Sequence, residues 1–226
     1  MILDGLSALT LSLVLFSLWH ASCSLGARLT IALFAITAVT CWIFEEVGVA
    51  TGLVYGPYHY TAALGPWLGS VPVLIPLAWF MLIYPGYVAA NLIADGWPVG
   101  TRGTLGHLVG LAALGALIMT ACDLVADPIL SGPTVRAWVW EQGGPYFGVP
   151  VQNSVGWAVT TFVVYVLFRS LERHWTPSPT GRRLATASVR PDGDERPPVP
   201  LTRAHTPIAA ATSAHVRSST PSSRRR

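Results

Sequence analysis

Five apolar stretches, each about 20 residues long, constrain the fold of this chain more than any other feature of its sequence. They cover residues 2–19, 27–44, 71–94, 105–126 and 155–171. A helix needs about 20 mostly apolar residues to cross the hydrocarbon core of a bilayer, and only helices and closed barrels satisfy their backbone polar groups there. The sequence therefore predicts an all-α integral membrane protein, a bundle of about five transmembrane helices.

The charged residues divide the chain into two parts. Residues 1–175 carry 5 Arg and 8 Asp or Glu, whereas residues 176–226 carry 9 Arg, 3 acidic residues, eight prolines and no Phe, Trp or Tyr. Since such a composition cannot bury a core, we expect a transmembrane domain over residues 1–175 and a disordered cytoplasmic tail over residues 176–226. A basic balance confined to a tail of this kind argues against binding to nucleic acid.

The arginines predict how the protein is oriented. With five spans, Arg136 is alone on one side of the membrane. The other side receives Arg28, Arg102, Arg169, Arg173, Arg182 and Arg183. Because positive residues favour the cytoplasmic side, we expect a multi-pass protein of the plasma membrane with its N-terminus outside and its C-terminus in the cytoplasm. Asp4, in place of a basic n-region, favours a first span over a cleaved signal peptide.

Cofactor chemistry has little support in the sequence. Histidines stand singly in four different segments, at His20, His59, His107 and His174. A membrane di-iron site needs clustered histidines, so no metal site is expected. The chain has no lysine for a Walker motif and no GxGxxG between a strand and a helix. We therefore expect neither a metal nor an organic cofactor.

Four carboxylates interrupt the apolar stretches on the predicted outer side. Glu45 and Glu46 end the second stretch, and Asp123 and Asp127 lie four residues apart, on one face of the fourth. Ionisable residues at such depth are energetically unfavourable and often functional, and burial favours the neutral carboxyl that can act as a general acid. The alternative is that they are interfacial caps or hydrogen bonds between helices.

The two loops on the same side carry many aromatic side chains. Residues 45–60 and 138–157 are also rich in Gly and Pro, which specify tight, fixed backbone paths. We expect acids and aromatic side chains to converge there on a binding site.

Four blocks of sequence in this order resemble the CruF-type carotenoid biosynthesis proteins. The first, residues 45–60, reads EE-x-G-x-x-TG-x-x-x-G-x-Y-x-Y, and the others cover residues 64–79, 123–128 and 138–157. The resemblance implies addition of water to the terminal trisubstituted double bond of an acyclic carotenoid, which gives a tertiary alcohol.

The residues suit this chemistry, because an acid sheltered from water can protonate the alkene and aromatic faces can stabilise the cation. We expect Glu45 or Glu46 to donate the proton and Asp123 or Asp127 to orient water. The residues expected to contact the substrate are Tyr55, Tyr58, His59, Tyr60, Trp79, Trp138, Trp140, Asn153 and Trp157. The expected partners are a lipophilic carotenoid, membrane lipid and other enzymes of the carotenoid pathway.

Three other functions share some of these features. A lycopene-type cyclase starts from the same cation but traps it with an internal double bond. A non-catalytic membrane subunit would hold carotenoid or another enzyme. A prenyltransferase would bind magnesium diphosphate through Asp95 and Asp127, but the predicted topology places these residues about 30 Å apart, which argues against it.

Overall fold

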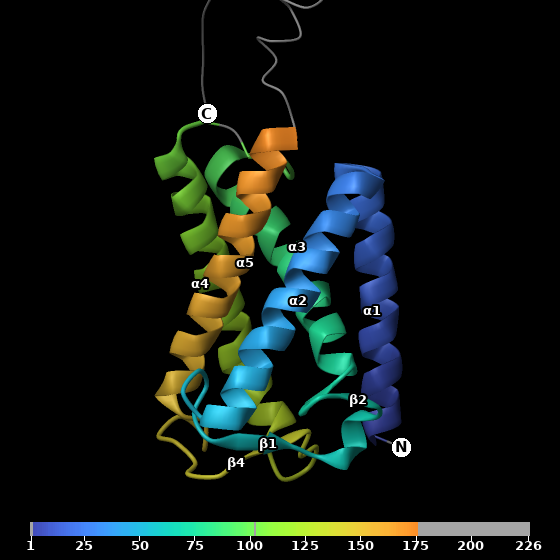
Figure 1. Ribbon diagram of the computed structural model, residues 1–226, viewed down its shortest axis with the longest axis vertical. Coiled ribbons are helices and arrows are strands. Elements are labelled where there is room, and N and C mark those ends of the chain that lie inside the picture. Colours follow the sequence, from blue (N-terminus) through green and yellow to red (C-terminus); the bar gives the residue numbers. More distant parts are fainter. Residues whose placement is uncertain (1, 102, 176–226) are drawn as a thin grey trace, which may run out of the picture. The chain divides into compact units, whose positions relative to one another are not determined.

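The computed structural model describes residues 2–101 and 103–175, and the predicted tail, residues 176–226, lies outside the described residues. Five long helices make up most of the described part (Figure 1): α1 Ile2–Leu25, α2 Ala27–Thr51, α3 Leu74–Asp95, α4 Leu105–Leu130 and α5 Val151–Trp175. All five are long and apolar enough to cross a membrane. The predicted all-α bundle of five spans is confirmed.

The boundaries of the third span differ from the prediction. The apolar stretch begins at Val71, but α3 begins only at Leu74. Val71 and Pro72 form strand β3 (Val71–Pro72), which pairs antiparallel with β2 (Trp67–Leu68). Hydropathy alone cannot separate an apolar strand from the helix that follows it, and proline is accepted at such short sheet edges.

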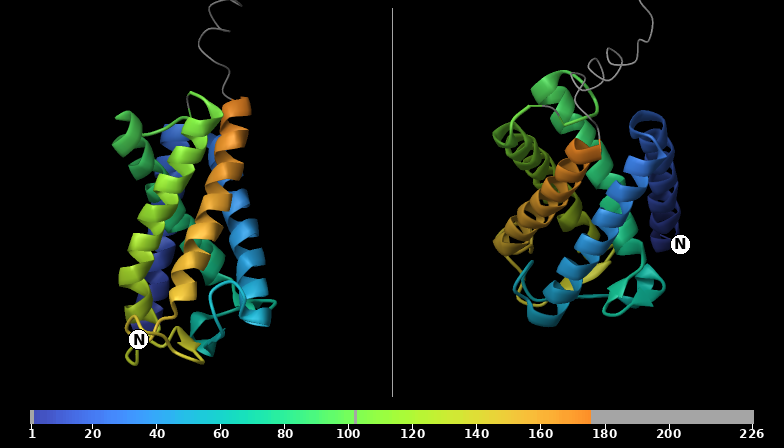
Figure 2. Two further views of the ribbon diagram at one scale, coloured as in Figure 1. Left: turned by 90° about the vertical axis from the view of Figure 1, so that its left-hand side faces the viewer. Right: turned by 45° about the horizontal axis from the view of Figure 1, so that its top comes forward.

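The helices pack around α3. It contacts α1, α2 and α4, while α5 packs against α2 and α4. Figure 2 shows this arrangement from two further sides. Only 17% of the apolar window of α1 is buried, against 44% of that of α3. Helix α1 is therefore the peripheral member of the bundle.

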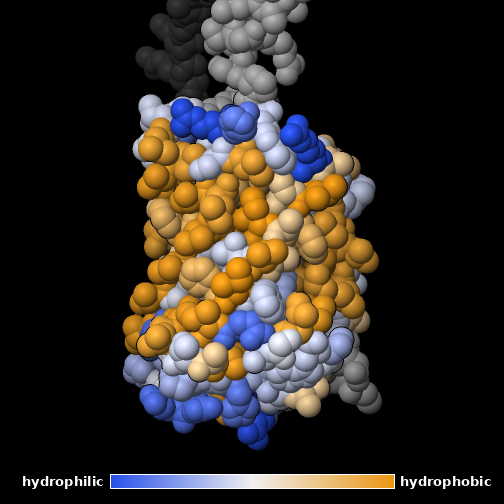
Figure 3. Space-filling model, viewed as in Figure 1, coloured by the Kyte–Doolittle hydropathy of each residue, from blue (hydrophilic) through white to orange (hydrophobic). Residues whose placement is uncertain are grey.

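Apolar side chains on the outside of the helices suit a lipid environment. Figure 3 shows a broad hydrophobic band on one face of the molecule, with hydrophilic residues gathered towards both ends of the helices. Leu15, Ile31 and Leu117 are each about two-thirds exposed. Such exposure is unfavourable in water but normal against lipid tails.

A short antiparallel strand pair closes one end of the bundle. Strand β1 (Tyr58–Tyr60) pairs with β4 (Trp138–Trp140), so that Tyr58 lies opposite Trp140 and Tyr60 opposite Trp138. The sequence predicts loops with fixed backbone paths here, and the hydrogen-bonded ladder between the two strands is what holds these paths in place. Since side chains alternate along a strand, the two tyrosines and the two tryptophans share one face, which is turned towards the helices.

The opposite end of the bundle is held by a buried polar cluster. Arg169 is fully buried, and its Nη1 donates hydrogen bonds to Asn91 Oδ1 (2.8 Å) and Thr101 Oγ1 (3.2 Å). The hydroxyls of Tyr87 and Thr101 donate to Glu172, at 2.6 and 2.5 Å. This cluster ties the end of α5 to α3 and to the α3–α4 connection.

Candidate functional site

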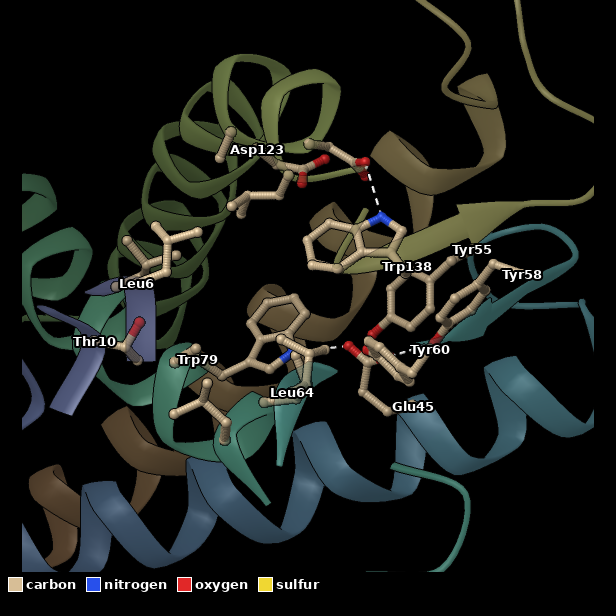
Figure 4. A pocket seen from close by; sticks show the side chains of 18 of the residues that line it. Leu6, Thr10, Glu45, Tyr55, Tyr58, Tyr60, Leu64, Trp79, Asp123 and Trp138 are labelled. Carbon is tan, nitrogen blue, oxygen red and sulfur yellow. Dashed lines mark hydrogen bonds between the residues drawn. The ribbon is translucent and has the colours of Figure 1, made fainter. Parts of the chain in front are cut away.

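A mostly apolar cavity of about 140 Å³ lies at the end of the bundle closed by β1 and β4. Side chains from all five helices and from the α2–α3 and α4–α5 connections line it, and Figure 4 shows it from close by. All predicted site residues except Glu46 and His59 line the cavity. The lining ones are Glu45, Asp123, Asp127, Tyr55, Tyr58, Tyr60, Trp79, Trp138, Trp140, Asn153 and Trp157.

Glu45 is buried and accepts three hydrogen bonds. Tyr58 and Tyr60, both from β1, donate their hydroxyls to Oε2, the latter at 2.7 Å. The indole Nε1 of Trp79, on α3, donates to Oε1 at 2.9 Å. This carboxylate therefore has a donor for each of its oxygens and a fixed orientation at the cavity wall (Figure 4).

Asp127 is held in a similar way from the other strand. The indoles of Trp138 and Trp140 donate to its Oδ1 at 3.0 and 3.1 Å. The amide of Asn153 donates to its Oδ2 at 2.7 Å. Asp127 thus also accepts three hydrogen bonds, two of them from the strand that pairs with β1.

Asp123 lies one helical turn before Asp127 and has a different environment. The Asn153 amide nitrogen that binds Asp127 also donates to Asp123 Oδ2, again at 2.7 Å. A side-chain amide carries two N–H donors, so one Asn can serve both carboxyls at once. Among the described residues, Asn153 provides the only hydrogen bond recorded for the Asp123 carboxyl.

Aromatic faces form much of the remaining wall. Trp79 and Trp157 are stacked, with ring centroids 4.0 Å apart. Tyr58 and Tyr60 meet edge to face at 5.3 Å, and the Tyr55 hydroxyl is 2.9 Å from Thr160 Oγ1. These contacts hold the rings in place around the cavity.

The three tyrosines that follow α2, which we call the loop tyrosines (Tyr55, Tyr58 and Tyr60), keep their hydroxyl protons at any ordinary pH. Burial raises the pKa of Tyr58 and of Tyr60, and the neighbouring Glu45 carboxylate raises both further. Burial also raises the pKa of Tyr55. Their hydroxyls therefore stay neutral.

Two predicted site residues lie away from the cavity. Adjacent helical residues point about 100° apart, so Glu46 turns outward from Glu45 and accepts a hydrogen bond from the Ser70 backbone N–H at 2.6 Å. His59 projects from the opposite face of β1 to its neighbours and lies 3.5 Å from Glu141, where both side chains are more than half exposed. Neither side chain can contact a molecule in the cavity.

The contribution of α1 to the cavity was not predicted from the sequence. Leu6, Ser7 and Thr10 line the cavity from its side. The first apolar stretch carries no charged or aromatic residue at these positions that would have pointed to a site. Only the packing of α1 on α3 brings them there.

The described part of the chain forms neither a metal cluster nor a paired diphosphate site. Within residues 2–101 and 103–175, no group of three His, Cys, Asp or Glu side chains is placed to hold a metal ion. Asp95 ends α3 at the other end of the bundle from Asp127 and pairs with His107 at 2.9 Å. The two aspartates cannot share one ligand.

Two comparisons relate this chain to known proteins. The family described as Carotenoid biosynthesis protein matches residues 5–190. Bisanhydrobacterioruberin hydratase from Haloarcula japonica is 34% identical over 142 residues, which are 62% of this chain and 45% of that protein. The match thus spans less than half the length of this relative. No solved structure matches the chain.

Proposed function

We propose that this chain, which belongs to the carotenoid biosynthesis protein family, adds water to the terminal double bond of an acyclic carotenoid. The observation that carries the proposal is the meeting of Glu45, Asp123 and Asp127 at one cavity walled by Trp and Tyr rings. The name of the hydratase relative supports the same reaction.

The reaction needs an acid, a site for a cation and a water molecule. A proton added to the CH carbon of the terminal double bond leaves a tertiary cation on the dimethyl carbon. Water bonds to that carbon and then loses a proton, so the net change is addition of one water without oxidation or reduction. The proton donor must be shielded from bulk water, and a positioned donor of this kind typically contributes about 100-fold to 10,000-fold in rate.

The hydrogen bonds favour Asp123 as the proton donor. Donors directed at a carboxylate stabilise its charged form, and Glu45 and Asp127 each accept three such bonds. Asp123 accepts one, and a second charge beside Asp127 would be unfavourable. This proposal differs from the expectation that Glu45 or Glu46 donates the proton.

The remaining groups have complementary roles. Asp127, ionised and next to Asp123, accepts the proton that water releases. Transfer of this proton from Asp127 to Asp123 then restores the starting state of the pair. The stacked Trp79 and Trp157 offer their π-faces to the tertiary cation. Ionised Glu45, which lines the same cavity from α2, stabilises the same positive charge.

The proposed orientation places the cavity in the outer half of the plasma membrane. Arg28 and Arg173 lie at the end of the bundle opposite the cavity, where Arg28 stacks on the ring of Trp175 at 3.9 Å. Positive residues favour the cytoplasmic side, so the cavity end, which carries β1 and β4, faces outward.

Isotope labelling tests the reaction. Membranes containing the protein are incubated without oxygen, with an acyclic carotenoid, in water enriched in ¹⁸O. Hydration puts the heavy oxygen into a tertiary alcohol. A requirement for dioxygen rules out hydration, and a cyclic isomer without added oxygen identifies a cyclase instead.

A further inference from the structure

The cavity lining changes character from one side to the other. At the carboxylate side Glu45, Asp123 and Asp127 are at most 5% exposed. At the other side the lining is uncharged and only half-buried, and it comes from α1, α3 and α4: Leu6, Thr10, Met81, Leu82 and Ala126. At this second side the uncharged lining reaches the surface of the bundle, and we call this part of the cavity wall the opening.

Three helices frame the opening. Helix α1 packs against α2 and α3, and α4 packs against α3 and α5, whereas α1 and α4 have little contact with each other. The lining residues of α1 and α4 thus come from two helices that both pack against α3 but have little contact with each other. Figure 4 shows Leu6 and Thr10 on the side of the cavity away from Tyr55 and Tyr58.

The α3 side of the opening lies at the depth of lipid tails. Met81 and Leu82 come seven and eight residues after the start of α3, which is about 10 Å along the helix at 1.5 Å per residue. The hydrocarbon core of a bilayer is about 30 Å thick, so this position is below the headgroups. None of the five residues that frame the opening is charged.

We infer that the cavity receives its ligand sideways from the bilayer, between α1 and α4, and that the ligand is one end of an extended acyclic polyene. A cavity of about 140 Å³ is smaller than the 300–1,000 Å³ typical of pockets that enclose a whole drug-sized ligand. The terminal unit of the polyene lies between the carboxylates, and the rest of the chain stays in lipid against α1 and α4. This inference rests on the proposed function for the identity of the ligand.

Narrowing the opening tests the inference directly. Ala126→Phe on α4 and Thr10→Phe on α1 each put a ring into the opening from opposite walls. The matched controls are Ala121→Phe and Ser12→Phe, which place the same ring on exposed positions of the same helices outside the cavity. The purified proteins are reconstituted in phosphatidylcholine vesicles with lycopene as the probe, and binding is followed by quenching of tryptophan fluorescence.

Both opening variants should bind lycopene about tenfold more weakly than their controls, because the added phenyl ring takes up space in the opening that the ligand would occupy. Thermal unfolding of each variant shows whether it is folded, and the two walls provide independent tests. Wild-type binding by both folded opening variants, or equal weakening by the controls, overturns lateral entry. Because binding needs no turnover, the result does not depend on whether the labelling experiment finds hydration.

Discussion

Tyr58 and Trp140 lie directly opposite each other in the β1–β4 ladder, yet their side chains donate hydrogen bonds to different carboxylates. Tyr58 binds Glu45 on α2, and Trp140 binds Asp127 on α4. Tyr60 and Trp138, the other pair on this face, repeat the arrangement. The strand pair therefore sets the position of acids on two helices at once.

Replacing Asp123 should abolish most of the activity without unfolding the protein. Asp123→Asn keeps the shape of the side chain but removes the acidic proton, so the hydration rate should fall about 100-fold or more. Glu46→Gln is the control, because Glu46 lies outside the cavity and should keep wild-type activity. Initial rates of alcohol formation in membranes measure both. Full activity of Asp123→Asn would show that another group delivers the proton.

Glu45→Gln should reduce stability as well as activity. The Gln amide nitrogen has no lone pair to accept the bonds that Tyr58, Tyr60 and Trp79 donate to the carboxylate, so at least one buried donor loses its partner. An unsatisfied buried donor costs about 1–3 kcal/mol. Thermal unfolding in detergent measures the change, with Glu46→Gln as the neighbouring control. A midpoint equal to that of the control contradicts the hydrogen-bond arrangement.

Stability should decline in alkaline solution because of the loop tyrosines. Burial raises the pKa of Tyr58 and Tyr60 in the folded protein, whereas tyrosines of the unfolded chain ionise near pH 10. As the pH rises, the tyrosines of the unfolded chain therefore lose their protons before those of the folded protein. The contribution of each buried tyrosine to the free energy of unfolding is complete below pH 10. Above pH 10 it is lost, by about 1.4 kcal/mol per pH unit for each tyrosine. In the double variant Tyr58→Phe/Tyr60→Phe, the free energy of unfolding should decline less steeply between pH 10 and 11 than in the wild type. A slope equal to that of the wild type excludes these two tyrosines as the cause of the decline.

Arg169→Ala should destabilise the bundle without touching the cavity. The guanidinium is fully buried and bonded to Asn91 and Thr101, and removing one member of such a buried charged cluster costs about 3–5 kcal/mol. Arg173→Ala, at an exposed position on the same helix, is the control. Unfolding experiments on both variants measure the difference, and a loss as small as that of Arg173→Ala contradicts a stabilising role for the cluster.

Reporter fusions should locate the two ends of the bundle. A reporter after Thr104 or after Thr176 should lie in the cytoplasm, because α4 begins and α5 ends at the end of the bundle that carries Arg28 and Arg173. A reporter inserted after Gly144, in the loop that follows β4, should lie outside and serves as the opposite control. A periplasmic signal after Thr104 would reverse the proposed orientation.

The sequence predicted the helices well because hydropathy acts over 20 residues at a time. Grouping Glu45 with Asp123 and Asp127 needed only the alternation of the spans, which brings every second loop to the same side. Other features depend on local geometry that no single stretch records. The β1–β4 pairing joins loops far apart in sequence, and it decides that Tyr58 and Tyr60 face the cavity while His59 does not.

Helix rotation is the other property that the sequence did not reveal. Glu45 and Glu46 are chemically equivalent in the sequence, and only the packing of α2 turns one inward and the other towards Ser70. The number of hydrogen-bond donors at each carboxylate also depends on packing, because these donors come from side chains on other helices and strands. The proposed assignment of the proton to Asp123 therefore required the structure.

The three-residue length of β1 and β4 makes their spacing intolerant of insertion or deletion during evolution. One residue added within β1 would put Tyr58 and Tyr60 on opposite faces of the strand, so that one of them turned to solvent, since each step along a strand reverses the side chain. Glu45 would then lose one of its two tyrosine donors in a single mutational event, and the ladder that aligns Trp138 and Trp140 with Asp127 would be disturbed as well. Related chains should therefore vary in length between the strands and the helices, but keep the spacing of alternate aromatic residues inside each strand unchanged.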